Sequence, residues 1–204
     1  MLYLKRPENQ RIRHWLDEQA AQPLSYSQVG MTSSDLMPGG YHHINHEVCI
    51  GQGRLAFQAA KEALGQWGCF NLPWMRLLFD GNPEPGNHLA IAAQVASVWT
   101  VHCTRVVACN GSSNNPNLWS FTVGTLPRHM LRGEEQISVT LDSVSGNVLY
   151  RIRSFSRPNQ RLANVFLKLI RHQQNRFCEE STSAIKRYVR ARERIPMGEP
   201  VKLS

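Results

Sequence analysis

Hydrophobic and polar residues follow two different periods along the chain, and the change of period divides it into segments. Apolar residues recur at helical spacing over 54–67, and Gly68 follows them, which suits the end of a helix. From residue 75 onward the apolar residues come in short runs, and over 137–141 they occupy every second position, as in a half-buried strand. Turns rich in glycine, proline and asparagine separate these runs. The pattern therefore predicts a helix ahead of a series of antiparallel strands.

The same reasoning extends to the rest of the chain. It predicts helices at 7–21, 54–67 and about 160–192, and strands at 41–50, 75–79, 88–96, 98–109, 118–126, 135–142 and 147–155. The last helix carries one apolar stripe, and Pro196 stops it. Because the strands follow one another without intervening helices, we expect an antiparallel meander. The predicted fold class is α+β, with a curved antiparallel sheet wrapped around a long C-terminal helix.

The predicted domain organisation has three parts: an N-terminal helix and linker over 1–39, a single domain over 40–192, and a C-terminal tail over 193–204. With 204 residues, of which 42% are hydrophobic, the chain is long enough to bury a large core. The sequence has no apolar run of the roughly 18 residues that span a bilayer, and its N-terminus lacks the apolar stretch of a signal peptide. We therefore expect a cytoplasmic protein.

Charge is unevenly distributed, because residues 1–150 have a net charge of −1 and residues 151–204 a net charge of +9. The candidate surface for an anionic partner lies near the end of the last predicted helix and consists of Lys186, Arg187, Arg190 and Arg192. Such a surface fits an acidic protein or an anionic membrane. Nucleic acid is disfavoured because aromatic residues are not interleaved with the arginines. The alternative is a solvated helix face whose apolar stripe closes the domain.

Several motifs lie between residues 40 and 190. They are His46 with Gly51-Gln-Gly53, Pro73-Trp74, the block Gly124-Thr-Leu-Pro…His129…Gly133-Glu-Glu135, and Ser154-Phe-Ser-Arg-Pro158. On these residues the sequence resembles the uncharacterised protein family 0548, a domain of unknown function. Arg128 departs from the family pattern, in which a small residue is expected. The order of elements also resembles the helix-grip fold of the START-like, or Bet v 1-like, superfamily. That resemblance implies an apolar cavity between the sheet and the last helix.

The block over 124–135 contains the candidate catalytic residues His129, Glu134 and Glu135. A histidine and a carboxylate in one loop could act as a general base and its orienting partner. Because Glu134 and Glu135 are adjacent in a strand, only one of them can face a cavity. The alternative interpretation is structural: His129 would bond to backbone carbonyls, and a glutamate would pair with a nearby arginine.

Candidate ligand-binding residues come from the aromatic residues of the strands, from the same block and from two strand arginines. They are Trp99, Trp119, Phe121, Gly124, Thr125, His129, Arg151 and Arg153. The aromatic residues could line a cavity or form ordinary core, and the arginines could anchor a carboxylate or phosphate, or be solvated.

The sequence offers little support for a metal or a cofactor. His42 and His46 share one face of a strand, whereas His43 and Cys49 point to the other, and no metal-ligand spacing is present. The five cysteines contain no Cys-x-x-Cys pair, which argues against a disulfide framework and a structural zinc site. Gly51 and Gly53 lack the rest of a phosphate-binding motif and favour a turn from strand to helix. We expect no metal and no cofactor.

Together, these features favour a protein that binds a hydrophobic or amphipathic small molecule between the sheet and the C-terminal helix. One alternative is an enzyme of the cyclase, isomerase or hydrolase type that uses His129 as acid or base. The other is a non-catalytic adaptor that docks through its basic C-terminal helix. A binding role is favoured over an enzymatic one.

Overall fold

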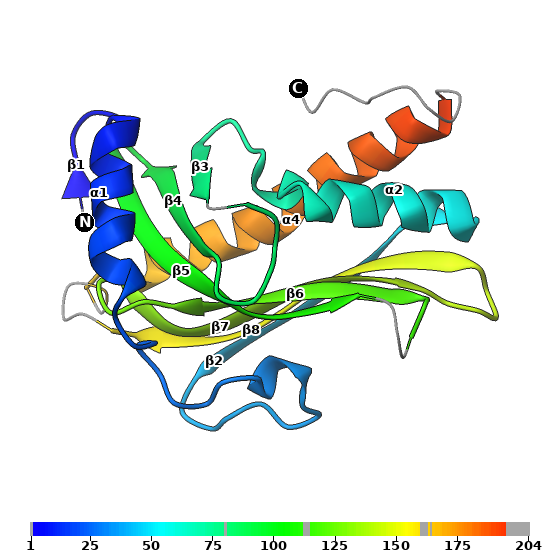
Figure 1. Ribbon diagram of the computed structural model, residues 1–204, viewed down its shortest axis with the longest axis horizontal. Coiled ribbons are helices and arrows are strands. Elements are labelled where there is room, and N and C mark those ends of the chain that lie inside the picture. The colour runs from blue at the N-terminus through cyan, green and yellow to red at the C-terminus, as the bar shows by residue number, and fades with distance from the viewer. Residues whose placement is uncertain (1, 80, 112–114, 160–162, 164, 195–204) are drawn as a thin grey trace.

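The structure is a computed structural model that describes residues 2–79, 81–111, 115–159, 163 and 165–194. One strongly bent antiparallel sheet forms its centre, with the strand order β2-β8-β7-β6-β5-β4-β3, and the short β1 pairs with β5 (Figure 1). The strands are β1 Leu2–Tyr3, β2 His42–Gln52, β3 Met75–Phe79, β4 His88–Val95, β5 Val98–Gly111, β6 Leu118–Thr125, β7 Leu131–Leu141 and β8 Asn147–Pro158.

The helices lie on both sides of this sheet. They are α1 Asn9–Ala20, α2 Gly53–Gly65 and α4 Leu167–Arg194, with short 3-10 turns η1 at Met31–Ser33 and η2 at Gly68–Phe70. Figure 1 shows α2 and α4 on one side of the sheet, and the segment with η1 on the opposite side. We call the side toward α4 the inner face and the opposite side the outer face.

The main core fills the space between the inner face, α2 and α4. Alternation along the strands supplies it: on β7, Ile137, Val139 and Leu141 point inward and are buried. The apolar stripe of α4 meets them with Phe177 and Ile185, both buried. The fold is thus the predicted one, a curved sheet that wraps around a long C-terminal helix.

A second, smaller core lies on the outer face, where α1 packs against β4 and β5. Ile12 and Leu16 of α1 are buried there against Ala92 and Val101. The segment between α1 and β2 then crosses the outer face of β7 and β8 (Figure 1). The N-terminal residues therefore cover an outer surface that the alternation of the strands leaves partly apolar.

The observed elements follow the predicted ones with a few differences. β7 begins at Leu131 rather than 135, because its first residues pair with Arg157 and Pro158 at the end of β8. Gly133 has a φ of 149°, and a Cβ atom there would overlap the carbonyl oxygen of Phe155, so this paired position requires glycine. The expected start of the last helix at 160–162 and its stop at Pro196 fall outside the described residues.

The pairing of β2 with β8 leads directly into α2. Gly53 has a φ of 78° and donates its N–H to the carbonyl of Gly146 at 2.8 Å, so the chain turns from strand to helix at a left-handed residue. The described part of the chain contains no helix that is both long and apolar enough to cross a membrane.

Candidate functional site

Glu134 and Glu135, the adjacent glutamates of β7, point to opposite faces of the sheet. Glu134 is 3% exposed on the outer face, where it contacts the N-terminal segment. Glu135 points inward and is half-buried in the main core. The two neighbouring carboxyl groups therefore have separate roles.

Glu134 holds the N-terminal segment on the sheet. Its Oε2 accepts hydrogen bonds from the Tyr26 hydroxyl at 2.8 Å and the Gly30 N–H at 2.7 Å. Its Oε1 accepts from the N–H of Thr32 at 3.0 Å and from the Thr32 hydroxyl at 2.6 Å. Burial and the neighbouring Glu134 raise the pKa of Tyr26 far above its usual value, so the phenol keeps its proton and donates it. This carboxylate, predicted as a catalytic candidate, serves a structural purpose.

Glu135 lies in the interior, close to Cys69, Tyr150 and Cys178, whose titration it influences. Burial raises the pKa of Glu135 from 4.5 to about 7. Glu135 thus keeps some accessible surface although the surrounding protein desolvates its carboxyl group. Its carboxyl group is therefore partly protonated and partly ionised near neutral pH.

Several inner-face residues, one of them beside Glu135, carry buried polar atoms with no hydrogen-bond partner among the residues that the structure describes. Ser154, which is 3% exposed and pairs directly with Glu135 in the sheet register, has such an Oγ atom. Thr104, which is 4% exposed, has such an Oγ1 atom, and His102 has such an Nδ1 atom. Burying a polar atom without a partner costs free energy, so these atoms mark a place where another molecule could bond.

His129 and His102 form a ring pair at one end of the inner face, with their planes tilted by 43°. Their ring centroids lie 4.5 Å apart, and His129 Nδ1 accepts a hydrogen bond from the N–H of Leu131 at 3.0 Å. Burial lowers the pKa of His129 to about 4, and burial together with His129 lowers that of His102 well below its usual value. Both rings are neutral at pH 7. Within the described residues no carboxylate bonds to His129, so the predicted pairing of His129 with Glu134 or Glu135 is not formed.

Aromatic rings form the part of the main core on the side of α2. Phe121 makes an edge contact with Trp119 at 5.9 Å between ring centroids and with Trp67 at 5.1 Å. Phe70 stacks on Phe177 of α4 at 5.4 Å. The inner face thus combines an apolar aromatic wall with polar atoms near Glu135, as small-molecule sites typically do.

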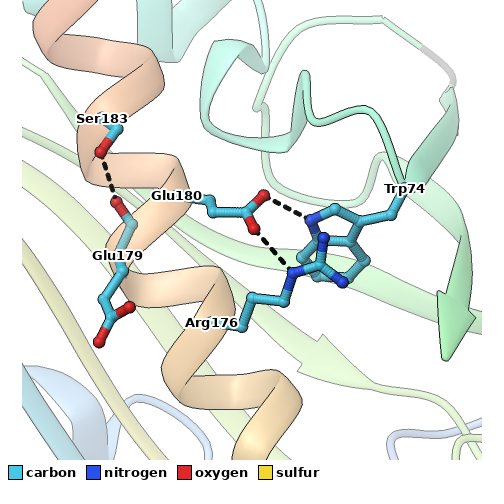
Figure 2. A network of polar contacts seen from close by, with 5 residues as sticks. All are labelled: Trp74, Arg176, Glu179, Glu180 and Ser183. Atoms are coloured by element: carbon cyan, nitrogen blue, oxygen red, sulfur yellow. Dashed lines mark hydrogen bonds and ion pairs between the residues drawn. The ribbon is translucent and has the colours of Figure 1, made fainter. Parts of the chain in front are cut away.

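Polar contacts also hold α4 on the inner face. Figure 2 shows the side of α4 near Trp74, where Glu180 accepts hydrogen bonds from Trp74 Nε1 at 2.6 Å and Arg176 Nε at 2.7 Å. The guanidinium of Arg176 lies 4.5 Å from the centroid of the Trp74 ring. Burial alone would raise the pKa of Glu180, but the hydrogen bonds from Arg176 and Trp74 outweigh it and hold the pKa below its usual range.

Two further contacts tie α4 to β8 and β2. Arg171 donates to Ser156 Oγ at 2.9 Å and to Gln174 Oε1 at 2.6 Å, and His46 Nε2 lies 2.9 Å from Thr182 Oγ1. The described residues hold no cluster of three or more residues suited to a metal ion. His46 therefore belongs to the helix contact.

The other predicted ligand-binding residues do not all face the interior. Trp119 and Phe121 do, whereas Trp99 lies on the outer face with the second core. Arg151 and Arg153 also point outward, toward Asn45 Oδ1 at 3.0 Å and the carbonyl of Ser34 at 2.9 Å. The arginines therefore help to hold the outer surface and do not reach a ligand under α4.

Gly124 and Thr125 belong to the attachment of the N-terminal segment. A Cβ atom on Gly124 would lie 2.5 Å from the Tyr26 hydroxyl. Thr125 Oγ1 accepts the N–H of Gly133 at 2.9 Å and lies 2.7 Å from Ser25 Oγ. Arg128, the departure from the family pattern, lies with its guanidinium 4.4 Å from the centroid of Trp15 in α1.

The structure also contains a surface groove of about 420 Å³. It is lined by Glu62, Gly65, Gln66, Asn82, Pro83, Glu84, Cys109 and Trp119. Because Trp119 belongs both to this groove and to the inner aromatic wall, the groove approaches the interior from the side of α2.

The basic residues at the end of α4 differ in exposure. Arg187 and Arg190 are exposed, and Lys186 is half-buried. Arg192 lies 3.6 Å from Glu62 of α2 in an ion pair. Part of the predicted basic surface therefore joins the two helices.

This arrangement is that of the helix-grip class of folds, as found in Bet v 1-like, or START-like, proteins. Two solved structures share the fold. The Zhui aromatase/cyclase from Streptomyces sp. R1128 matches with a TM-score of 0.52 and 13% identity, over 78% of this chain and 99% of its own. Norcoclaurine synthase from Thalictrum flavum matches with a TM-score of 0.51 and 11% identity, over 78% of this chain and 99% of its own.

Within that class, the chain belongs to the family described as a domain of unknown function (DUF1990), whose model matches residues 25–184. The UPF0548 protein At2g17695 of Arabidopsis thaliana is 31% identical over 152 residues, which are 72% of this chain and 74% of that protein. A UPF0548 protein of Dictyostelium discoideum is 24% identical over 213 residues, 96% of this chain and 99% of that protein. The predicted family and fold are both confirmed.

Proposed function

We propose that this protein binds a hydrophobic or amphipathic small molecule between the sheet and α4. The apolar part of the ligand would lie against the aromatic wall of Trp119 and Phe121, and its polar group would reach Glu135 and Ser154. The observation that supports this best is the buried Oγ of Ser154, which has no partner among the described residues. A ligand hydroxyl or amine would satisfy that atom and recover the free energy lost by its burial.

The shape of the fold supports the same proposal. Side-chain contacts hold the long α4 on the inner face near its start, through Arg171, and at its middle, through Glu180. Two proteins that share the fold, the Zhui aromatase/cyclase and norcoclaurine synthase, are enzymes by name. At 13% and 11% identity, however, their activities are not evidence for an activity of this chain.

The proposal is tested by calorimetric titration with 2-(1-naphthyl)ethanol, a neutral amphiphile with an aromatic body. We expect saturable binding of one molecule per chain. The variant Ser154→Val should weaken it by about fivefold, the value of one neutral hydrogen bond. Thr140→Val is the matched control, because Thr140 is a half-buried residue of β7 on the outer face. Non-saturable binding, or an equal loss in both variants, contradicts the proposal.

We also propose that the exposed basic end of α4 docks on an anionic surface, supported by the exposure of Arg187 and Arg190. Co-sedimentation with phosphatidylserine vesicles should fall when both are replaced by glutamine, and should fall further as salt rises. Binding that is independent of salt and of both arginines argues against this role.

A further inference from the structure

Glu135 differs from the other glutamates of the described strands in the direction of its side chain. The strands contain three glutamates, Glu47, Glu134 and Glu135. Glu47 points outward and lies 3.6 Å from Arg151, and Glu134 is bonded to the N-terminal segment. Glu135 is the one that points under α4. It brings an acidic group to an interior whose other walls are mainly aromatic and aliphatic.

The neighbours of Glu135 leave its charge uncompensated. Cys69 of η2, Tyr150 of β8 and Cys178 of α4 face it, and burial raises the pKa of all three, so they stay neutral. The Tyr150 hydroxyl donates to Ser181 at 3.2 Å. An ionised carboxylate in such surroundings is costly unless a cation pairs with it.

The cationic and titratable groups on the surrounding elements have other contacts. Arg171 of α4 is bonded to Ser156 and Gln174, and His46 of β2 to Thr182. His102 and His129 are neutral, and their rings contact each other in a tilted arrangement. Burial lowers the pKa of His42, with the charge of Arg171 as the next cause, so it too is neutral. The described side chains therefore provide no cation that pairs with Glu135.

We propose that Glu135 recognises a basic nitrogen, so that the preferred ligand is an amphipathic amine that is protonated in water. This deepens the proposed binding function and depends on it. An ammonium group would supply the missing positive charge and could donate to both the Glu135 carboxylate and Ser154 Oγ, which stand side by side in the sheet register. A ligand alcohol would gain only neutral hydrogen bonds, and a ligand carboxylate would repel the ionised form of Glu135.

The inference predicts a proton release that a neutral ligand would not cause. With a pKa of about 7, Glu135 is mostly protonated at pH 6 before binding. Pairing with an ammonium requires the carboxylate, so binding of an amine at pH 6 must release a proton. Amine affinity should therefore rise from pH 5.5 to pH 7.5, and the affinity for the alcohol should not rise.

Three probes with the same aromatic body provide the test: 2-(1-naphthyl)ethylamine, 2-(1-naphthyl)ethanol and 1-naphthylacetate. Calorimetry in buffers of different ionisation enthalpy measures both affinity and protons released. At pH 7.5 we expect the amine to bind at least about tenfold more tightly than the alcohol, with the acid weakest. Glu135→Gln should remove both the preference for the amine over the alcohol and the proton release. Glu47→Gln, on the outer face, should change neither.

The possible outcomes separate this inference from the proposed function. Equal binding of amine and alcohol, or amine binding without proton release in the unmodified protein, overturns the amine inference and leaves amphiphile binding intact. If none of the three probes binds, the proposed function itself fails. The proton count in the unmodified protein needs no variant, so the inference stays testable even if Glu135→Gln folds poorly.

Discussion

Replacing Glu134 by glutamine tests whether this carboxylate stabilises the fold by holding the N-terminal segment on the sheet. The change keeps the size of the side chain but exchanges one carboxylate oxygen for an NH₂ group, which cannot accept a hydrogen bond. If the remaining oxygen keeps its two bonds from Thr32, the NH₂ group faces the Tyr26 hydroxyl and the Gly30 N–H, both donors. The variant therefore loses both charge-assisted bonds: the Gly30 N–H faces a donor, and the Tyr26 hydroxyl can bond again only by turning to accept from the NH₂ group.

The magnitude follows from the value of such bonds. Hydrogen bonds to a charged group contribute about 1.5–3 kcal/mol each, and because neighbouring bonds are not additive we expect a total loss of about 3 kcal/mol. For a chain of this length that corresponds to a fall in Tm of roughly 6–12 °C. Urea unfolding at pH 7 measures it. Tyr26→Phe, which removes only one of the bonds, should lose about 1–2 kcal/mol.

Glu135→Gln is the matched control, because it makes the same chemical change one residue further on. It should not destabilise the protein at pH 7, since Glu135 has no described cation partner and is strongly desolvated. A loss below about 0.5 kcal/mol in Glu134→Gln, within the range of an ordinary surface substitution, would refute the structural role of Glu134.

Three further predictions concern the interior and the turn before it. The folded pKa of Glu135 is raised from 4.5 to about 7, so its ionisation makes folding less favourable as pH rises from 4.5 to 7. At pH 8, Glu135→Gln should therefore be more stable than the unmodified protein by on the order of 3 kcal/mol in urea unfolding. A stability difference between the two proteins that is the same at pH 4 and at pH 8 would be inconsistent with this. The folded pKa of His129 is depressed to about 4, so its contribution to the free energy of unfolding is present above pH 6.5 and is lost as pH falls toward 4. His129→Gln should flatten that part of the curve of stability against pH. An unchanged slope would argue against a buried neutral imidazole. Gly133→Ala places a Cβ atom against the Phe155 carbonyl and should cost more than about 3 kcal/mol, whereas Gly65→Ala has no atom near its new Cβ and should be neutral or stabilising by about 0.5–1 kcal/mol; similar thermal shifts in the two variants would contradict the strand geometry at Gly133.

Much of the fold could be predicted from local patterns because the strands alternate and the turns between them are marked. The strand at 75–79 agrees at both ends, and most other boundaries differ by one to three residues. The start of β7 at Leu131 could not be read from alternation, since Arg132 and Gly133 interrupt the apolar pattern and are strand residues only through their pairing with β8. The two-residue β1 likewise exists through pairing with β5.

The candidate site was harder to predict, because the surroundings of a strand side chain depend on the strand register and on which elements cover each face of the sheet. Adjacency alone showed that only one of Glu134 and Glu135 could face a cavity, but not which one. The inward position of Glu135 follows from its place between Gly133 and Ile137 on the alternating strand, and the outward position of Glu134 leaves it for the N-terminal segment.

Trp99, Arg151 and Arg153 were candidate ligand contacts on the strength of residue type, yet their strand positions turn them outward. Ser154, although part of a family motif, and Thr104 were not predicted as ligand contacts, since a strand serine or threonine is ordinary until its hydroxyl is known to be buried and without a partner. One signal was present in the sequence: Ser154 and Ser156 continue the alternation of the buried Tyr150 and Ile152 with polar residues, which marks the polar part of the inner face.

A crystal structure of the protein with 2-(1-naphthyl)ethanol tests the proposed binding function most directly. The account predicts the naphthyl ring against Phe121 and Trp119, and the hydroxyl within about 3.2 Å of Ser154 Oγ or of the Glu135 carboxyl group. It also predicts that α4 keeps its contacts with Trp74 and Ser156. A probe found only on the outer surface, with Ser154 bonded to other side chains of the protein, would contradict the account.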